Sequence, residues 1–548
     1  MPIVTIDGRQ IEVEQGTSVI QAADRLGVEI PRFCYHPDLK PEGNCRMCLV
    51  DVEGFQKPVV ACATPVMDGM VVRTPHTSAV ASRAVHGVLE FLLVNHPLDC
   101  PICDQAGECS LQDFYMRPDY GQHPSRVDPV EKVHKRKRVS LGSRIVLDAE
   151  RCVMCSRCVR FSEEVSGYAE LQFVRRGNHV ELTPFEDRAL QDPYAGNLAD
   201  VCPVGALTSQ DFRFKRRVWH LSHTDSICAG CSTGCNVRID HFQGRIERVV
   251  PRRNPSVNRS WLCDEGRLSF KSLDAAPRLA HPRRGDSRLD WSEATALADR
   301  SLRAATAAKG LPLAALACAS ATNESLWLFR QYVEAVFPQH RLEFRLDRES
   351  EAASERQDTL LRRVDKHPNT MGALHLGFSH GVGLAGLVAL AEKGEFGALL
   401  MLYHPPLVGE ENPDTTDLLQ RLLAAVRESV VLTTHDVPYL AQAKVLLPVA
   451  AWSEEEGTYT NYQGVTQYAG RAVSSQGATR PAADVLGDFW QYATSTRRQT
   501  GSEHVFHEIA ASVPAFRGLS YAMLESRTAT VYPPEGRMHY GQEGFAGR

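Results

Sequence analysis

Cysteine is the residue type that carries chemistry in this chain, because its placement is grouped rather than scattered. The sequence has 16 cysteines in 548 residues, and all except Cys318 lie between Cys34 and Cys263. Grouped cysteines in a reducing compartment are metal ligands more often than they are disulfide partners. The sequence therefore predicts a metal-rich front half and a metal-poor back half.

The first group has a spacing of C-x10-C-x2-C-x13-C. It consists of Cys34, Cys45, Cys48 and Cys62. A C-x2-C pair with two flanking thiols is how ferredoxins supply four thiolates to a [2Fe–2S] cluster, although the plant-type loop has only four residues between its first two cysteines. Four thiolates would also suit zinc, so a zinc knuckle is the alternative for this group.

The second group combines one histidine with three cysteines in the spacing H-x3-C-x2-C-x5-C. It consists of His96, Cys100, Cys103 and Cys109. Three cysteines leave a [4Fe–4S] cluster one ligand short, and His96 is placed to supply it. A neutral imidazole in place of a thiolate should raise the reduction potential, as histidine does in Rieske centres. The alternative is that His96 is an ordinary surface or core residue.

The third group resembles a two-cluster bacterial ferredoxin that has lost one cluster. Its cysteines are Cys152, Cys155, Cys158 and Cys202, the last followed by Pro203. In such ferredoxins the fourth cysteine of each C-x2-C-x2-C-x3-C-P run binds the other cluster. The four ligand positions of one cluster are all cysteine here. The four positions that would bind the other cluster are occupied by Ser162, Asp192, Ala195 and Leu198. The sequence therefore predicts a single [4Fe–4S] cluster.

The fourth group has the spacing C-x2-C-x3-C-x27-C and completes the ligand count. It consists of Cys228, Cys231, Cys235 and Cys263. A zinc ribbon is the alternative, but ribbons use symmetrical C-x2-C pairs. Fifteen cysteines and one histidine then give four ligands to each of four clusters, one [2Fe–2S] and three [4Fe–4S]. Cys318 is left over in an apolar stretch and is predicted to be a buried structural thiol.

The expected elements place these ligands at the ends of helices and strands. Thr17 is expected to cap a helix that stops at Gly27, and Thr77 to cap an amphipathic helix that stops at Asn95, before His96 and Pro97. Short strands are expected at residues 4–6, 11–13, 49–52 and 59–61, a further strand after Cys235, and an α/β layer with strands at residues 398–402 and 430–433 in the back half.

Composition and charge exclude several classes of function. The net charge of −5 provides no basic field for nucleic acid, and no apolar run approaches the roughly 18 residues of a membrane span. The first nine residues lack the features of a signal peptide. Gly381-x-Gly383-x-x-Gly386 fits a dinucleotide pattern but has no good strand before it and no suitable acidic residue after it. We therefore expect a soluble, cytoplasmic chain with no site for NAD or FMN, and with membrane contact only through partners.

Three segments resemble the large iron–sulphur subunit of bacterial respiratory complex I, the G-type subunit of NADH:quinone oxidoreductase. They are residues 31–37 with 43–50, residues 95–109, and residues 151–161. The resemblance implies electron transfer from a flavin-bearing NADH subunit to the first group, then the third, then the second, and on to a small ferredoxin-like subunit that leads to quinone. It also implies quinone-module partners, ion translocation by partner subunits, and a place in the peripheral arm on the cytoplasmic side of the inner membrane.

The resemblance implies a multidomain α+β and α/β fold in five parts. These are a β-grasp [2Fe–2S] ferredoxin-type domain (1–78), a His/Cys-ligated [4Fe–4S] domain (78–117), a [4Fe–4S] ferredoxin-like domain with one cluster lost (140–215), a [4Fe–4S] domain of the molybdopterin-enzyme type (221–277), and a degenerate molybdopterin-oxidoreductase-like domain (278–548).

Two departures argue against a molybdopterin cofactor. Glu265 stands where molybdopterin enzymes usually have a lysine, and the chain after Cys263 is short for their catalytic portion. No residue is therefore expected to do bond-making catalysis. The alternatives are the iron–sulphur subunit of an NAD-linked formate dehydrogenase or hydrogenase, and a zinc-stabilised interaction protein. The loss of one crossed ligand set counts against the former.

Overall fold

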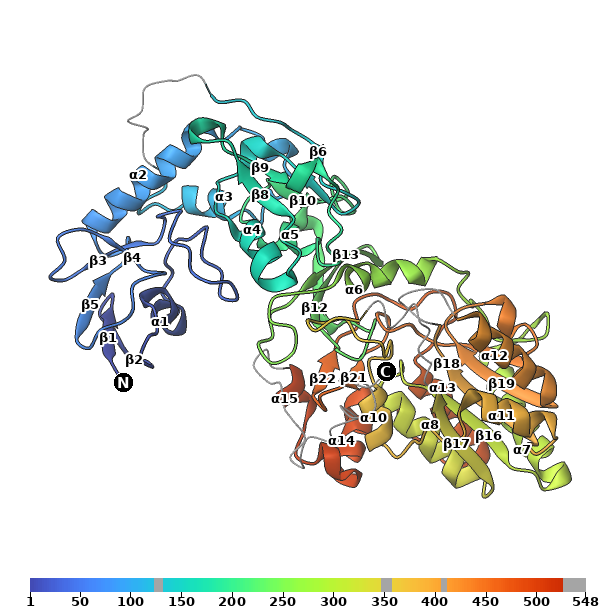
Figure 1. The fold of residues 1–548 in the computed structure, drawn as a ribbon. Helices are drawn as coiled ribbons and strands as arrows, with labels where there is room; N and C mark the ends of the chain where they lie inside the picture. The colour runs from blue at the N-terminus through green and yellow to red at the C-terminus, as the bar shows by residue number, and fades with distance from the viewer. Residues whose placement is uncertain (123–131, 346–356, 406–411, 526–548) are drawn as a thin grey trace. The chain divides into compact units, whose positions relative to one another are not determined.

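The computed structural model describes residues 1–122, 132–345, 357–405 and 412–525. The chain forms two compact units, Met1–Leu221 and Ser222–Arg548 (Figure 1). Over the described ranges, no helix combines the length and the apolar character that crossing a membrane requires.

The first unit begins with a five-stranded sheet in the order β2-β1-β5-β3-β4. Strands β1 and β2 form a hairpin whose turn, Asp7-Gly8, has positive φ at both residues, which glycine tolerates at no cost. Helix α1 ends at Gly27, also at positive φ, as the sequence predicts. The bounds are β1 Ile3–Ile6, β2 Arg9–Glu12, α1 Val19–Leu26, β3 Leu49–Val52, β4 Val59–Val60 and β5 Met70–Arg73.

Both predicted helix caps are wrong by one residue. Ser18, not Thr17, precedes α1, and its backbone N–H donates to the Gln21 side chain over 3.0 Å. Ser78, not Thr77, caps α2 (Ala79–Asn95), accepting from the N–H groups of Val80 and Ala81. In each pair both residues can cap a helix, so the sequence alone could not choose between them.

The remainder of the first unit consists of short elements joined by loops that carry cysteines. It contains a three-stranded sheet in the order β10-β7-β6 and a separate β8–β9 hairpin. The bounds are α3 Ser110–Tyr115, β6 Val139–Ser140, β7 Ile145–Leu147, α4 Arg157–Arg160, β8 Leu171–Val174, β9 Glu181–Pro184, α5 Asn197–Val201 and β10 Leu207–Ser209.

The second unit starts with an antiparallel sheet of β11 (Ser222–Ile227), β12 (Asn236–Phe242) and β13 (Arg245–Pro251), so the strand predicted after Cys235 is present. A seven-stranded sheet follows in the order β15-β14-β20-β19-β18-β16-β17, parallel from β20 to β17. Its strands are β14 Arg283–Arg284, β15 Ser287–Arg288, β16 Leu313–Cys318, β17 His340–Arg345, β18 Ala398–Tyr403, β19 Glu428–Thr433 and β20 Val445–Pro448, and β21 Gly457–Thr460 pairs with β22 Thr466–Ala469.

Helices cover both faces of the parallel sheet, which confirms the predicted α/β layer. Ala315 and Ala317 of β16 pack with α7, α8 and α13, whereas Ala314 and Leu316 pack with α11 and α12 on the opposite face. A sheet buried on both faces needs apolar residues throughout each strand. The helices of this unit are α6 Asp264–Leu268, α7 Trp291–Lys309, α8 Asn323–Val336, α10 Thr370–His375, α11 Gly383–Glu392, α12 Pro413–Ala425, α13 Ala482–Thr494, α14 Ser502–Ser512 and α15 Tyr521–Glu525.

Candidate metal centres

The first group of thiols converges beside the β3–β4 hairpin. Cys48 directly precedes β3 and Cys62 follows β4, and the N–H of Ala61 donates to the carbonyl of Cys48 over 2.9 Å. The N–H of Cys34 donates to the Cys45 sulphur over 3.3 Å. Hydrogen bonds from Cys45 and Cys62 lower the pKa of the Cys34 thiol to about 2, and the contact with Cys34 raises the pKa of Cys45. Thiols packed this closely are suited to bind metal as thiolates.

The second group lies between α2 and α3. His96 follows the last residue of α2, Cys100 and Cys103 flank a single 3₁₀ turn, and Cys109 caps α3. Burial, followed by the charges of Arg151 and Lys132, lowers the pKa of His96 to about 4. The imidazole is therefore neutral at pH 7, which is the form that binds metal. In the described part of the chain the ring makes no hydrogen bond to the three thiols, so its role as a ligand stays a prediction.

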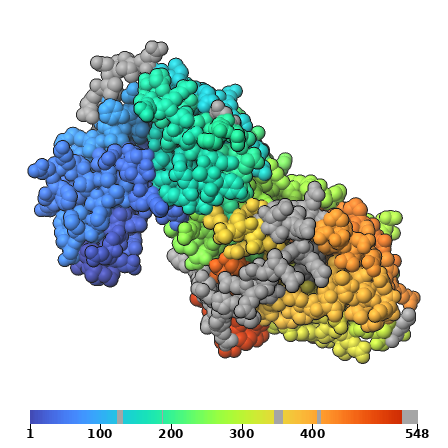
Figure 2. Space-filling view, in the orientation of Figure 1, coloured from blue at the N-terminus to red at the C-terminus, as the bar shows by residue number. Residues whose placement is uncertain are grey.

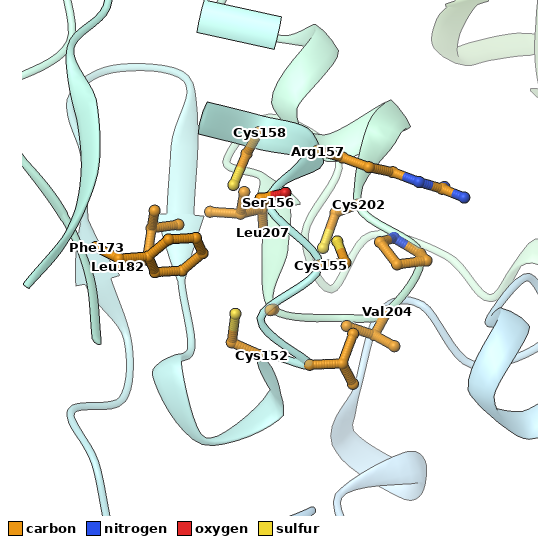
Figure 3. Close-up of a pocket in the computed structure, with 13 residues that line it drawn as sticks. Cys152, Cys155, Ser156, Arg157, Cys158, Phe173, Leu182, Cys202, Val204 and Leu207 are labelled. Carbon is orange, nitrogen blue, oxygen red and sulfur yellow. The ribbon is translucent and has the colours of Figure 1, made fainter. Parts of the chain in front are cut away.

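The third group surrounds a small cavity (Figure 3). The sulphur atoms of Cys152, Cys155, Cys158 and Cys202 face this space, and Phe173 and Leu182 close one side of it. Met154 and Ser156 have left-handed φ values of 52° and 61°, which turn the loop so that successive cysteines face inward. Burial raises the pKa of Cys152, Cys155 and Cys202 to about 11 each and raises that of Cys158 still further. Binding of a metal would have to displace these protons.

Residues at the four replaced positions have ordinary structural roles. The Ser162 hydroxyl accepts from the N–H of Glu170 over 3.1 Å, and Asp192 accepts from the N–H of Tyr194 over 2.8 Å. Ala195 and Leu198 are buried. Hydrogen bonding and apolar packing therefore occupy these positions.

Three cysteines of the fourth group lie in the loop that joins β11 to β12. Cys228 directly follows β11 and Cys235 directly precedes β12, and the N–H of Cys228 donates to the carbonyl of Cys235 over 2.7 Å. Cys263 caps α6, and its sulphur accepts from the N–H of Gly266 over 3.3 Å. Burial raises the pKa of Cys228 to about 12 and those of Cys235 and Cys263 well above the usual value.

A segment of the same unit covers the fourth group. The N–H of Ser232 donates to the carbonyl of Asp365 over 2.9 Å, and the Cys231 thiol lies 4.0 Å from the carbonyl oxygen of Leu361. Glu265 forms ion pairs with Arg362 and Lys366, at 3.2 and 3.3 Å. The acidic residue that departs from the molybdopterin-enzyme pattern is thus neutralised by two cations next to the cysteines.

Two glycines allow the backbone to come close to cysteine sulphur atoms. A Cβ on Gly205 would collide with the Cys103 sulphur, and a Cβ on Gly266 would lie 2.9 Å from the Cys228 sulphur and 3.3 Å from that of Cys263. Gly205 follows Cys202 by three residues, so the loops of the second and third groups touch. Sequence reasoning did not identify either glycine, because the contact partner of Gly205 is about 100 residues away in the chain.

The described residues include all sixteen cysteines, and none of them is in a disulfide, so each thiol can still bind metal as a thiolate. In the described ranges no three His, Cys, Asp or Glu side chains are arranged to hold a single metal ion. Cys318 is buried at the end of β16, with its sulphur 3.7 Å from the His404 carbonyl oxygen. Its burial is as predicted.

The remaining sequence motif, at residues 381–386, leads into α11. The Glu343 carboxylate accepts from the N–H groups of Val382 and Gly383, both over 3.2 Å, and a Cβ on Gly381 would collide with the same carboxylate. A side-chain carboxylate therefore takes the helix N-terminal donors that a phosphate would use in a dinucleotide site.

Five family models match the chain, in the order of the groups described above. They are a 2Fe-2S iron-sulfur cluster binding domain (residues 3–77), the NADH-ubiquinone oxidoreductase-G iron-sulfur binding region (86–122), the ferredoxin-like domain of NADH-quinone oxidoreductase subunit 3 (142–208), the molybdopterin oxidoreductase Fe4S4 domain (221–275) and molybdopterin oxidoreductase (360–492).

Similar proteins from several bacteria are named as the G-type subunit of NADH-quinone oxidoreductase. That of Streptomyces coelicolor is 41% identical over 347 residues, which cover 62% of this chain and 40% of the relative. That of Rickettsia bellii is 42% identical over 338 residues, which cover 61% of this chain and 48% of the relative. The chain is similar to this G-type subunit over about three fifths of its own length. The match spans less than half the length of either relative.

This similarity to the G-type subunit confirms the resemblance seen in the sequence. The family models also confirm the fold class, with an amino-terminal 2Fe-2S domain, 4Fe-4S modules and a molybdopterin-oxidoreductase-like carboxy-terminal part. A solved chain of an NAD+-reducing [NiFe]-hydrogenase in the H2-reduced state is 30% identical, with a TM-score of 0.35, and the match covers 40% of this chain and 91% of that chain.

Proposed function

We propose that the chain is an electron-transfer subunit of an NADH:quinone oxidoreductase, conducting electrons from an FMN- and NADH-binding subunit towards quinone. The observation that carries this proposal is the gathering of cysteines into four groups, in a chain that is 41% identical over 347 residues to a G-type subunit. The proposed partners are the flavin subunit, small ferredoxin-like subunits and quinone-module subunits. The proposed location is the peripheral arm, on the cytoplasmic side of the inner membrane.

The residues proposed to hold the clusters are those predicted from spacing. Iron–sulphur clusters supply one-electron transfer when bound. The chain contributes thiolates and one imidazole, excludes water from most of the thiols by burying them, although Cys100 is exposed, and adjusts potentials through hydrogen bonds and charge. The ligand sets are Cys34, Cys45, Cys48 and Cys62 for [2Fe–2S], and for three [4Fe–4S] clusters His96 with Cys100, Cys103 and Cys109, Cys152 with Cys155, Cys158 and Cys202, and Cys228 with Cys231, Cys235 and Cys263. The five-part domain division is proposed with the boundaries given above.

No molybdopterin is included in the proposal. The residues around the fourth group support this, because Glu265 is ion-paired with Arg362 and Lys366 beside the cysteines. A carboxylate already committed to two cations is a poor substitute for the lysine that molybdopterin enzymes usually place there.

Metal analysis of the full chain tests the proposal. The chain purified without oxygen should be brown, contain about fourteen iron atoms with matching sulphide, and show EPR signals of reduced clusters. Cys228→Ser should lose about four of the iron atoms, whereas Cys318→Ser, which alters the thiol left outside the four groups, should lose none. A colourless chain that holds zinc would overturn the proposal.

A further inference from the structure

Arg157 joins the backbones next to two of the cysteine groups within the first unit. Its guanidinium donates to the carbonyl of Tyr35 over 2.5 Å and to the carbonyl of Val201 over 3.3 Å. Tyr35 follows Cys34 of the first group, and Val201 precedes Cys202 of the third. One side chain therefore spans the contact between the two groups.

The same contact contains further hydrogen bonds, so the two groups are held firmly. Arg160 donates to the carbonyls of Cys34 and Lys40 and to the Ser156 hydroxyl. The N–H of Lys40 donates to Glu164 over 3.0 Å. The space-filling view shows the ferredoxin-type domain packed against residues 140–215 (Figure 2).

Arg157 differs from Arg160 in having a donor that is not used. All three nitrogens of the Arg160 guanidinium donate to protein acceptors. The Nε–H of Arg157 is buried and has no acceptor among the described residues. A buried N–H without an acceptor destabilises the fold, so an acceptor supplied by a bound cluster would relieve this cost.

The position of Arg157 places its charge beside both groups. Arg157 lies between Cys155 and Cys158 of the third group in the sequence, and its guanidinium donates to the carbonyl of Tyr35, the residue after Cys34 of the first group. Figure 3 shows the Arg157 side chain starting at the wall of the third cavity and extending away from it.

We infer that Arg157 is a shared positioning residue that raises the reduction potentials of the clusters in the first and third groups together. Its positive charge, held between the ligand loops of the two groups, stabilises the reduced, more negative state of both clusters, and its Nε–H is available to an acceptor that a bound cluster would supply. Hydrogen bonds to cluster sulphurs and nearby charge are established determinants of cluster potential. The inference rests on the proposed function, because it presupposes that both groups bind clusters.

EPR-monitored redox titration of the full, cluster-loaded chain tests this role. In Arg157→Gln the midpoint potentials of the first and third clusters should both fall, by about 59 mV for each tenfold loss of the reduced fraction. Arg157→Lys keeps the charge and should give smaller shifts. Arg73→Gln removes an exposed arginine of β5 that pairs with Glu53, and it should leave all four midpoints unchanged.

The second and fourth clusters provide an internal reference in every titration. Their midpoints should not move in Arg157→Gln. Unchanged midpoints in a fully loaded Arg157→Gln chain would overturn the inference while leaving the proposed function intact. Loss of iron from both variants, without a shift in the clusters that remain, would reduce Arg157 to a folding residue and overturn it too. Absence of iron from the unaltered chain would instead overturn the proposed function and the inference with it.

Discussion

At the scale of single residues, the close approach of Gly205 to Cys103 connects two ligand loops. The N–H of Ser110 also donates to the carbonyl of Pro203 over 3.1 Å, so the loops after Cys109 and Cys202 are joined by backbone as well. Protein interiors are packed densely enough that even one added methyl group is felt. The second group should therefore depend on the glycine of the third.

Gly205→Ala should reduce the iron bound by the second group. The new Cβ would occupy the space of the Cys103 sulphur, so the thiol must move away from its three co-ligands. We expect the EPR signal of the second cluster to be lost or broadened. Gly501→Ala is the control, because nothing lies within 4 Å of the added carbon. Full iron content with an unaltered second signal in Gly205→Ala would show that the contact is not needed.

His96→Cys should keep the second cluster and lower its midpoint potential. A thiolate adds a negative charge that the neutral imidazole lacks, and this charge disfavours reduction. Redox titration followed by EPR measures the shift. His86→Gln, on the same helix but with its ring 3.3 Å from the Tyr120 carbonyl oxygen, should have no effect. An unchanged potential in His96→Cys would mean that His96 is not a ligand.

At the scale of elements, the sequence predicted where helices and strands occur better than it predicted the residues at which the helices begin. Apolar periodicity identified α2, and Pro97 fixed its end, because proline cannot continue a helix. The residue that caps the amino-terminal end of α2 is the one whose hydroxyl accepts hydrogen bonds from the first unpaired N–H groups of the helix. The Thr77 hydroxyl instead donates to Asp7, which lies 70 positions earlier in the chain, and local sequence does not reveal such a contact.

Ser78→Ala should weaken the first turn of α2 by about 1 kcal/mol, because two backbone donors lose their acceptor. Hydrogen exchange of the full chain should show roughly fivefold faster exchange at Val80 and Ala81. Thr77→Val keeps the shape of its side chain and removes only the contact with Asp7, so these two amides should keep their protection. Equal effects of both substitutions would argue against Ser78 as the cap.

At the scale of the whole molecule, the ligand sets could be proposed from spacing, whereas the surroundings that adjust them could not. Cysteine and histidine spacing can be read directly from the sequence, so the four sets could be predicted from it. Arg157 and the cover over Cys231 depend on contacts between segments about 120 or more residues apart. The surroundings of Glu455 in the second unit also depend on contacts between distant segments. Glu455 lines a cavity of about 260 Å³ together with Glu324, Glu456, Asp484 and Arg471.

The second unit should lose stability as the pH rises from about 4.5 to 8. Burial raises the pKa of Glu324 to about 7, and hydrogen bonds to its carboxylate partly offset this rise. Burial, together with the charges of Glu324, Glu454 and Asp484, raises the pKa of Glu455 to about 8. Between the unfolded pKa of about 4.3 and these values, the folded state binds more protons than the unfolded state. Stability is therefore complete below that window and falls as the pH rises through it, by an amount on the order of a few kcal/mol.

Glu455→Gln isolates this effect, because a neutral amide of similar size replaces the carboxyl that must stay protonated. Calorimetry should show the thermal transition of the second unit at a higher temperature than in the unaltered chain at pH 8.5, with the difference vanishing at pH 5. Glu454→Gln is the contrasting variant, since Glu454 holds Arg278 through two hydrogen bonds of 2.7 and 2.9 Å and its loss should destabilise the unit at both pH values. Equal transition temperatures for Glu455→Gln and the unaltered chain at pH 8.5 would show that Glu455 is ionised in the folded state at no cost.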